Sequence, residues 1–251
     1  MSSVAVSFQG VRKSYRVTRQ KPNLSRQLLR WLIQQPSDIH RHEVLRGLDF
    51  TIHKGESVGI IGRNGAGKST LLSLIARTAQ PNVGTVDVKG RVGPLLELGA
   101  GFHPELTGAE NVYLNGMLLG MTRPEIRKRF DDIADFAGIG DFLYSPINTY
   151  STGMRARLGF AVVAHIDPDI LLLDEVLGVG DIDFRNKCSQ VLHGFRARER
   201  TIILVSHSAA SVRQLCERAI WIEHGLVKMD GTSKEVLEAY TASGSSKTPT
   251  N

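Results

Sequence analysis

Residues Val58–Ser69 read VGIIGRNGAGKS, the most informative segment of the chain. A short apolar run, Val58–Ile61, leads directly into a glycine-rich loop, and Lys68–Thr78 has the pattern of a helix. The loop Gly62–Ser69 fits GxxxxGK[ST] completely, in the strand–loop–helix context that this pattern requires. Glycines let the backbone wrap around phosphate oxygens, and the positive end of the helix dipole faces the same anion. The stretch therefore predicts a nucleoside triphosphate site.

Lys68 and Ser69 supply the side-chain chemistry of this loop. We expect the Lys68 amine to reach the β- and γ-phosphates, which also makes it a catalytic residue, and the Ser69 hydroxyl to bind Mg²⁺. The other nucleotide-binding positions in the loop are Gly62, Asn64, Gly65, Ala66, Gly67 and Thr70. A glycine-rich turn with no ligand is the alternative, and the agreement of strand, loop and helix argues against it.

Two acidic residues and a histidine follow other apolar runs. Ile170–Leu173 is followed by Asp174 and Glu175. We expect Asp174 to hold Mg²⁺ and Glu175 to polarise the attacking water. His207 follows the run Ile202–Val205 and is predicted to reach the γ-phosphate or that water. The alternative for His207 is a solvated loop histidine.

The remaining pattern predicts an α/β domain with a mainly parallel central sheet, because fully apolar runs are typical of buried parallel strands. Further strands are expected at residues 4–8, 44–52, 83–88 and 91–96, and a hairpin at 219–222 and 226–229. Further helices are expected at 124–137, 152–166, 208–216 and 233–240. The polar end, 243–251, is expected to be a disordered tail.

Positive charge gathers near the start of the chain. The 251 residues carry a net charge of +6, and residues 1–46 hold nine Lys or Arg against two acids, a net +7. A basic insertion at 16–43 contains a predicted amphipathic helix with apolar residues Leu24, Leu28, Trp31 and Leu32. This segment suits anionic lipid headgroups, nucleic acid or an acidic partner, or it is a solvated loop. A near-neutral remainder argues against a general nucleic-acid binder.

Composition excludes several other classes. Two cysteines cannot form a disulfide framework, and no His/Cys cluster suggests a zinc site. No apolar run approaches the roughly 18 residues that a membrane span needs, and the first residues lack the apolar core of a signal peptide. We therefore expect a protein that is neither secreted nor membrane-spanning by itself.

The stretch Tyr150–Met154, YSTGM, stands before a predicted helix and ahead of Asp174. In this order with the phosphate loop, the chain resembles the ATP-binding-cassette (ABC) ATPases over roughly residues 4–242. The resemblance implies an α/β P-loop NTPase fold with a mixed, mainly parallel core sheet, an antiparallel β subdomain and a helical signature subdomain at about 98–165. Residues 1–242 would form one nucleotide-binding domain.

The resemblance also implies roles for single residues. Ser151 and Gly153 lie in the signature motif, usually LSGGQ, whose helix faces the γ-phosphate of ATP held by a second subunit, which implies a homodimer. Tyr15 matches the aromatic residue that stacks on adenine; an ordinary edge-strand tyrosine is the alternative. Asp181 matches the dimer-contact loop. Glu97 stands where the family usually has glutamine, and a carboxylate there can orient water or Mg²⁺.

Leu95–Val112, LLELGAGFHPELTGAENV, resembles the family branch that exports bacterial surface polysaccharides such as O-antigen, capsule and teichoic-acid polymers. This branch implies ATP and Mg²⁺, two ATPase subunits bound to a separate polytopic permease, and a peripheral place on the cytoplasmic face of the inner membrane. No nucleic-acid partner is implied, and contact with the polysaccharide stays open. Phe102, His103 and Pro104 would lie near the permease, with simple loop packing as the alternative. The carbohydrate-binding domain of some O-antigen ATPases is expected to be missing.

Three other functions are alternatives to polysaccharide export. Another ABC exporter shares every motif. A soluble ABC ATPase acting on DNA or ribosomes is disfavoured by the single cassette and the short stretch between Lys68 and Ser151. A kinase or GTPase is disfavoured because Asn186-Lys187 is followed by Cys188-Ser189, so the guanine-reading pattern NKxD is missing.

Overall fold

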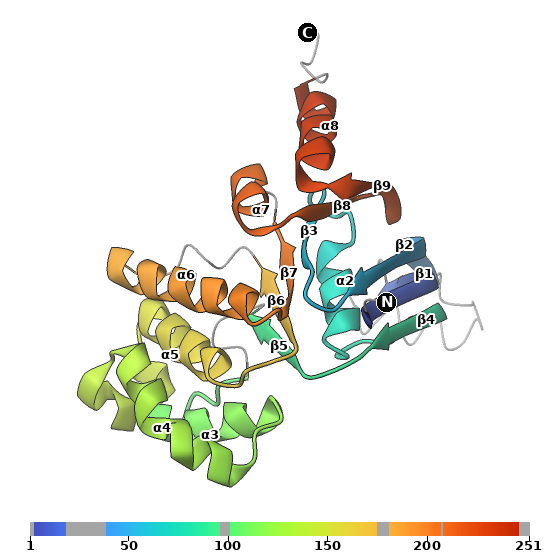
Figure 1. Cartoon of the computed structure of the whole chain (residues 1–251). Helices are drawn as coiled ribbons and strands as arrows, with labels where there is room; N and C mark the ends of the chain where they lie inside the picture. Colours follow the sequence, from blue (N-terminus) through green and yellow to red (C-terminus); the bar gives the residue numbers. More distant parts are fainter. Residues whose placement is uncertain (1–2, 19–38, 96–100, 175–180, 207, 246–251) are drawn as a thin grey trace, which may run out of the picture.

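The computed structural model describes residues 3–18, 39–95, 101–174, 181–206 and 208–245, and these form two sheets with helices around them (Figure 1). A six-stranded sheet has the order β5-β6-β7-β3-β8-β9, and a three-stranded antiparallel sheet has the order β2-β1-β4. The α/β class with a mixed, mainly parallel core sheet, predicted from the sequence, is confirmed.

The six-stranded sheet brings the predicted chemistry to one edge. Its parallel strands are β3 (Ser57–Ile61), β5 (Val92–Leu95), β6 (Ile170–Asp174), β7 (Thr201–Val205) and β8 (Arg218–Glu223), and β9 (Leu226–Thr232) closes the sheet antiparallel to β8. Val205 is in register with Asp174 on one side and Ile60 on the other. The phosphate loop after β3 and the acid that ends β6 therefore meet at the carboxyl edge.

Buried side chains pack on both faces of this sheet. Successive strand residues point to opposite faces, so Leu171 and Leu173 join one apolar cluster and Ile170 and Leu172 the other. The second cluster includes the buried face of α2 (Lys68–Ile75), which carries the phosphate loop at its start. Burying one such aliphatic side chain contributes about 1.5–3 kcal/mol, so the core fixes the start of α2 firmly.

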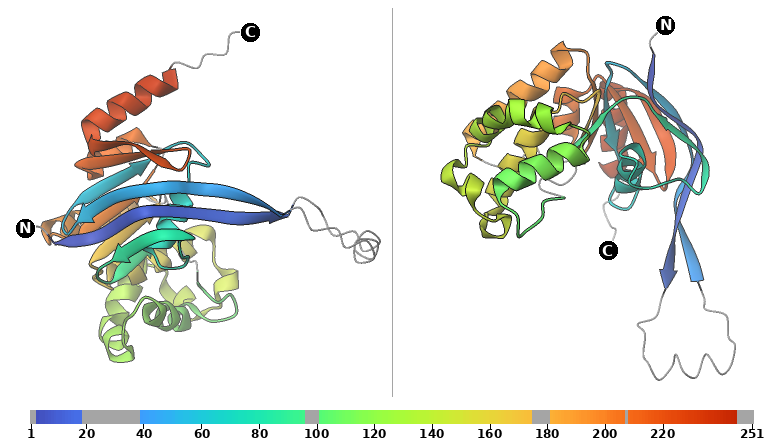
Figure 2. Two further views of the ribbon diagram at one scale, coloured as in Figure 1. Left: turned by 90° about the vertical axis from the view of Figure 1, so that its right-hand side faces the viewer. Right: turned by 90° about the horizontal axis from the view of Figure 1, so that it is seen from below.

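The antiparallel sheet is longer than the sequence indicated. β1 (Val4–Thr18) and β2 (Ile39–His53) are 15-residue partners, and β4 (Val83–Val88) pairs with the inner part of β1. Strands expected at 4–8 and 44–52 were too short, and 16–18 and 39–43 of the expected insertion belong to strands. Arg16, His42 and Glu43 of the outer hairpin are exposed polar residues, so this part of the two strands gives a weak hydropathy signal. Backbone hydrogen bonds between strands do not need one. Figure 2 shows β1 and β2 running side by side away from the rest of the chain. The helix expected between Leu24 and Leu32 lies outside the described residues.

Three helices gather beside β5 and β6: α3 (Gly108–Leu118), α4 (Arg123–Ala137) and α5 (Thr152–Ala164), with short 3₁₀ turns η1 (Gly140–Tyr144) and η2 (Ile147–Thr149) before α5 (Figure 1). The structure adds α3 and α6 (Ile182–Ala197), which the sequence pattern did not predict. A capping box joins Thr107 to Glu110 at the start of α3. That TxxE pattern was the available signal for this helix.

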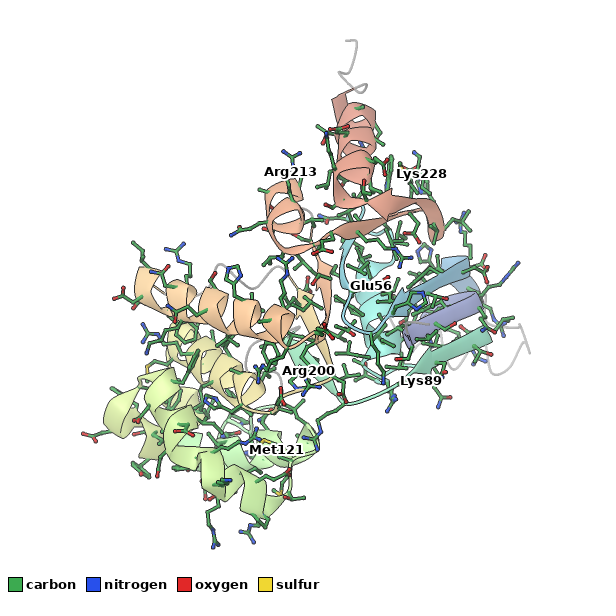
Figure 3. All side chains as sticks on the ribbon, viewed as in Figure 1. Glu56, Lys89, Met121, Arg200, Arg213 and Lys228 are labelled. Atoms are coloured by element: carbon green, nitrogen blue, oxygen red, sulfur yellow. The ribbon has the colours of Figure 1, made fainter. Side chains whose placement is uncertain are left out.

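The last part of the chain forms α7 (Ala209–Leu215) and α8 (Ser233–Ser245). Residues 243–245 of the expected disordered tail are therefore helical, and the helix expected to reach Thr78 ends at Ile75. At the opposite edge of the sheet from the phosphate loop, the Arg200 guanidinium pairs with Asp167 at 2.8 Å and Asp169 at 3.0 Å (Figure 3). These pairs fix the start of β6.

Both cysteines, Cys188 and Cys216, are buried and free, and burial raises the pKa of each thiol to about 12.

Candidate nucleotide-binding site

The loop between β3 and α2 has a backbone that only glycine satisfies. Gly67, the N-cap residue of α2, has a φ of 104°. A Cβ atom there would lie 2.6 Å from Cδ2 of Leu45 and 3.2 Å from the Val44 carbonyl oxygen. Because Gly67 has no side chain that could accept from the first turn, the leading N–H groups of α2 are left for an anion.

Lys68 lies across this loop. Its Nζ donates to the Gly62 carbonyl oxygen at 2.7 Å and to the Arg63 carbonyl oxygen at 3.1 Å. The ammonium group is therefore held against the same backbone that would wrap a phosphate. Ala66 is buried while Asn64 and Gly65 are exposed, so the tip of the loop is open to a ligand. Thr70 is half-buried on the first turn of α2.

Ser69 and Asp174, the two predicted metal ligands that the structure describes, line one cavity of about 710 Å³. The cavity is bounded by α2, β5, the end of α3 and the middle of α5. A hydroxyl and a carboxylate are hard oxygen donors, the kind that Mg²⁺ takes beside phosphate oxygens and water. Ser69 and Asp174 would each supply one such oxygen to a Mg²⁺ whose other ligands come from a nucleotide and water.

Three predicted residues, Glu97, Glu175 and His207, lie outside the described residues. Their neighbours in sequence are placed. Asp174 directly precedes Glu175, and Ser206 directly precedes His207. The Ser206 backbone N–H donates to the Ile60 carbonyl oxygen at 3.2 Å, and Asp174 is in register with Val205. Asp174 and Ser206, the described residues just before Glu175 and His207, therefore lie at neighbouring strand ends.

Tyr15 lies on β1 and is paired with His42 of β2. Its ring is 42% exposed, and the Lys13 ammonium lies 5.3 Å from the ring centroid. The exposed face suits stacking on a base, and the position on a two-stranded part of the hairpin also suits an ordinary strand tyrosine. Stacking on adenine stays a prediction.

Ser151 caps α5. Its Oγ accepts a hydrogen bond from the Met154 N–H at 3.2 Å, and its φ and ψ are those of an N-cap residue. Tyr150 is buried, its hydroxyl donates to the Phe142 carbonyl oxygen, and burial raises its pKa. Ser151 and Gly153 do not line the cavity that holds Ser69, which α5 reaches through Gly159, Val162 and Val163.

Asp181 begins α6 and is fully engaged inside its own chain. One carboxylate oxygen accepts from the Phe184 N–H at 2.9 Å, and the other pairs with the Arg157 guanidinium. The Phe184 N–H, followed by the Arg157 charge, lowers the pKa of Asp181. Arg157 is a residue that the sequence analysis missed, and its only sequence signal is a cation on the helix that follows YSTGM.

Gly62→Ala should disturb the phosphate loop and ATP binding together. A Cβ atom at Gly62 would lie 2.3 Å from the Ile222 carbonyl oxygen, so the backbone has to move. We expect a loss of about 1–3 kcal/mol of stability, as for other overpacked sites. ATP affinity should fall at least about tenfold, which corresponds to about 1.4 kcal/mol. Thermal unfolding with and without ATP measures both.

Gly194→Ala is the matched control, because a Cβ atom at this helical position meets nothing within 4 Å. That variant should be neutral or slightly stabilised, since alanine favours a helix over glycine by up to about 1 kcal/mol. Equal ATP stabilisation of both variants would contradict the role of Gly62.

Known proteins resemble this chain over most of its length. The ABC transporter family model matches residues 45–178. The O-antigen export system ATP-binding protein RfbB of Klebsiella pneumoniae is 48% identical over 200 residues, covering 80% of this chain and 81% of that protein. The teichoic acids export ATP-binding protein TagH of Bacillus anthracis is 42% identical over 235 residues; the match covers 94% of this chain and 42% of TagH.

A solved structure of a dimeric ATP-binding cassette with ADP and phosphate shares the fold. It has a TM-score of 0.71 and 23% identity and covers 91% of this chain. No helix in the described part of the chain is both long and apolar enough to cross a bilayer. The family model covers more than half of the chain, and relatives named for O-antigen and teichoic acid export confirm the predicted branch. The chain therefore belongs to the ABC transporter family.

Proposed function

We propose that this chain is the ATP-hydrolysing subunit of an ABC transporter that exports a lipid-linked surface polysaccharide across the cytoplasmic membrane. The observation that carries the proposal is the convergence of Ser69 and Asp174 on one cavity beside the phosphate loop. The relatives named for O-antigen and teichoic acid export support the cargo class. The chain would lie on the cytoplasmic face of the membrane, bound to a separate permease.

The phosphate loop and residues from other segments have separate roles in ATP hydrolysis. Backbone N–H groups at the start of α2 and the Lys68 ammonium bind the phosphates, and Tyr15 stacks on the adenine. Mg²⁺, held by Ser69 and Asp174, would neutralise charge on the β- and γ-phosphate oxygens. Glu175 polarises the attacking water, and His207 contacts the γ-phosphate. Glu97 orients water near the metal.

A second copy of the chain completes the site. The capped start of α5 is exposed at Ser151 and does not line its own chain's cavity. In a head-to-tail pair, this helix N-terminus would face the γ-phosphate bound by the other copy, where its dipole stabilises negative charge. ATP binding would close the pair, and hydrolysis would reopen it.

The cavity also offers a docking place for the permease. Phe102, Leu118 and Leu119 line one side of it, and Leu118 is 67% exposed. The loop 103–107, which precedes α3, is held in place by a buried side chain of that helix. The Asn111 amide nitrogen lies within hydrogen-bonding distance, 2.9–3.1 Å, of the His103, Leu106 and Thr107 carbonyl oxygens. A helix of the permease that binds here would lie between α2, which follows the phosphate loop, and the helices α3 and α5.

The test is a pull-down from detergent-solubilised native membranes with tagged Glu175→Gln protein, with and without ATP. Recovery of a small polytopic permease supports the transporter, and the genes beside that permease identify the polymer. Recovery of ribosomes or nucleic acid with no membrane protein would instead identify a soluble ABC ATPase.

Leu118→Asp should remove permease recovery in the same assay. The side chain is largely exposed, so the substitution should cost little stability, yet it puts a charge into the proposed docking face. We expect recovery to fall at least about tenfold, or about 1.4 kcal/mol, with unchanged ATP binding by the purified chain. Val83→Asp on β4, at 58% exposure, is the control and should bind the permease normally. Equal recovery with both variants places the permease elsewhere.

A further inference from the structure

We propose that Arg157 is a positioning residue that ties α5 to the start of α6, so that the two segments facing the second subunit move as one unit. The inference rests on the proposed dimeric function and deepens it. It assigns a role to a cation that contacts neither the phosphate loop nor the cavity among the described residues.

Arg157 is held from two sides. Its guanidinium pairs with one carboxylate oxygen of Asp181, and its Cζ lies 5.3 Å from the ring centroid of Phe184. The Arg157 side chain is only 26% exposed, whereas Asp181 is 58% exposed. A planar guanidinium that pairs with a carboxylate and stacks on a ring loses little freedom per contact, which lysine cannot reproduce.

The ring beneath Arg157 is itself fixed. Phe184 is buried and packs edge-on against Phe136 and Phe160, each with ring centroids 5.8 Å apart. Phe160 belongs to α5 and Phe184 to α6, so the aromatic contacts join the same two helices as the ion pair. The pair therefore sits on a rigid base rather than between mobile side chains.

Asp181 joins this base through its second oxygen. The oxygen that does not meet Arg157 accepts from the Phe184 N–H at 2.9 Å and caps α6. These contacts hold the carboxylate in its charged form, with its pKa lowered. Both carboxylate oxygens of Asp181 thus have partners within one chain. Asp181 therefore links α5 to α6, in addition to the dimer contact implied by the family resemblance.

The two linked segments have the same destination in the proposed dimer. Arg157 lies six residues after Ser151, so it stands about 9 Å along α5 from the capped start, at 1.5 Å per residue. Asp181 is the position matched to the dimer-contact loop. A shift of α5 toward the second copy must therefore carry the start of α6 with it, or break the contact between Arg157 and Asp181.

This arrangement predicts an effect on assembly and little effect on folding. Ion pairs with an exposed partner contribute little to stability, and the aromatic contacts remain when Arg157 is changed. The ion pair becomes important when α5 and α6 must both be in place for a second copy to close. ATP binding to a single chain does not require that alignment.

The test uses the Glu175→Gln protein, in which ATP should drive dimerisation without turnover. Sedimentation velocity measures the dimer dissociation constant with ATP, and a fluorescent ATP analogue at low protein concentration measures nucleotide binding by the monomer. Arg157→Ala should weaken dimerisation at least tenfold, leave nucleotide affinity within twofold and leave the melting temperature nearly unchanged. Arg157→Lys should be intermediate.

Asp181→Asn separates the ion pair from the helix cap. Asparagine is a good N-cap residue, so α6 should start normally while the charge is lost. We expect the same dimerisation defect as Arg157→Ala, and the double variant should be no worse than either single variant. Arg196→Ala is the control, because it removes a 2.9 Å ion pair with Glu217 from the far end of α6.

The outcomes separate two failures. If the Glu175→Gln protein does not dimerise with ATP, the proposed dimeric function is wrong. If it dimerises and Arg157→Ala dimerises equally well, the positioning role is overturned. Additive defects in the double variant would overturn it as well, as would a loss of folding in Arg157→Ala without a dimerisation defect in Asp181→Asn.

Discussion

Replacing Glu175 by Gln should reduce steady-state ATP hydrolysis at least about a hundredfold and leave ATP binding intact. Glu175 directly follows Asp174, which ends β6 beside the phosphate loop and lines the same cavity as Ser69. A positioned general base contributes about 10²–10⁴-fold to a rate, and glutamine keeps the shape of glutamate while losing its proton-accepting charge. Phosphate release measures turnover, and a fluorescent ATP analogue measures binding.

The control for this variant is Glu238→Gln on α8, where the side chain is exposed and far along the chain from the strand ends. That substitution removes one carboxylate without approaching the site, so turnover should stay unchanged. Unchanged hydrolysis in Glu175→Gln would reject the assigned role. Loss of binding in Glu175→Gln would instead show that the residue holds the nucleotide.

Lys68→Ala should weaken ATP binding itself. The Lys68 ammonium lies 2.7 Å from the Gly62 carbonyl oxygen, inside the loop that would surround the phosphates. Hydrogen bonds to charged groups contribute about 1.5–3 kcal/mol, so we expect affinity to fall about 10- to 150-fold. Turnover should become undetectable, because the same charge stabilises the transferred phosphoryl group.

Lys54→Ala is the matched control, since Lys54 is exposed in the turn that precedes β3, at the other end of that strand. It should bind ATP normally. Isothermal titration with ATP and Mg²⁺ compares the two variants. Normal affinity in Lys68→Ala would contradict the phosphate-binding role. Together, Lys68→Ala and Glu175→Gln distinguish loss of binding from loss of chemistry.

The sequence predicted those parts of the fold that have a recognisable pattern within a short stretch of residues. Val58–Ser69 predicted a strand, a loop and the start of a helix together. An apolar run, a glycine-rich stretch and a lysine in this order are typical of a phosphate-binding loop. The run Ile170–Leu173 was recognisable as a buried parallel strand for the same reason. The helix expected after YSTGM is present, and Ser151 caps it with a local hydrogen bond to the Met154 N–H.

Other parts were not readable from local pattern. The outer halves of β1 and β2 are paired through their backbones, and Arg16, His42 and Glu43 there are exposed, so hydropathy alternation is weak in that part. The start of α6 depends on Asp181, and the apolar face of that helix meets partners that are distant in sequence. The end of α8 has small polar residues, which are typical of a tail, yet the helix continues to Ser245.

Residue types at fixed short spacing were enough to predict the family, the α/β class and the chemical character of the phosphate loop. The shared cavity of Ser69 and Asp174 and the pairing of Asp181 with Arg157 are visible only once the chain is folded. Each of those contacts joins residues from different elements. Their meeting depends on how the strands are ordered and how α5 packs on α6, which no local pattern records.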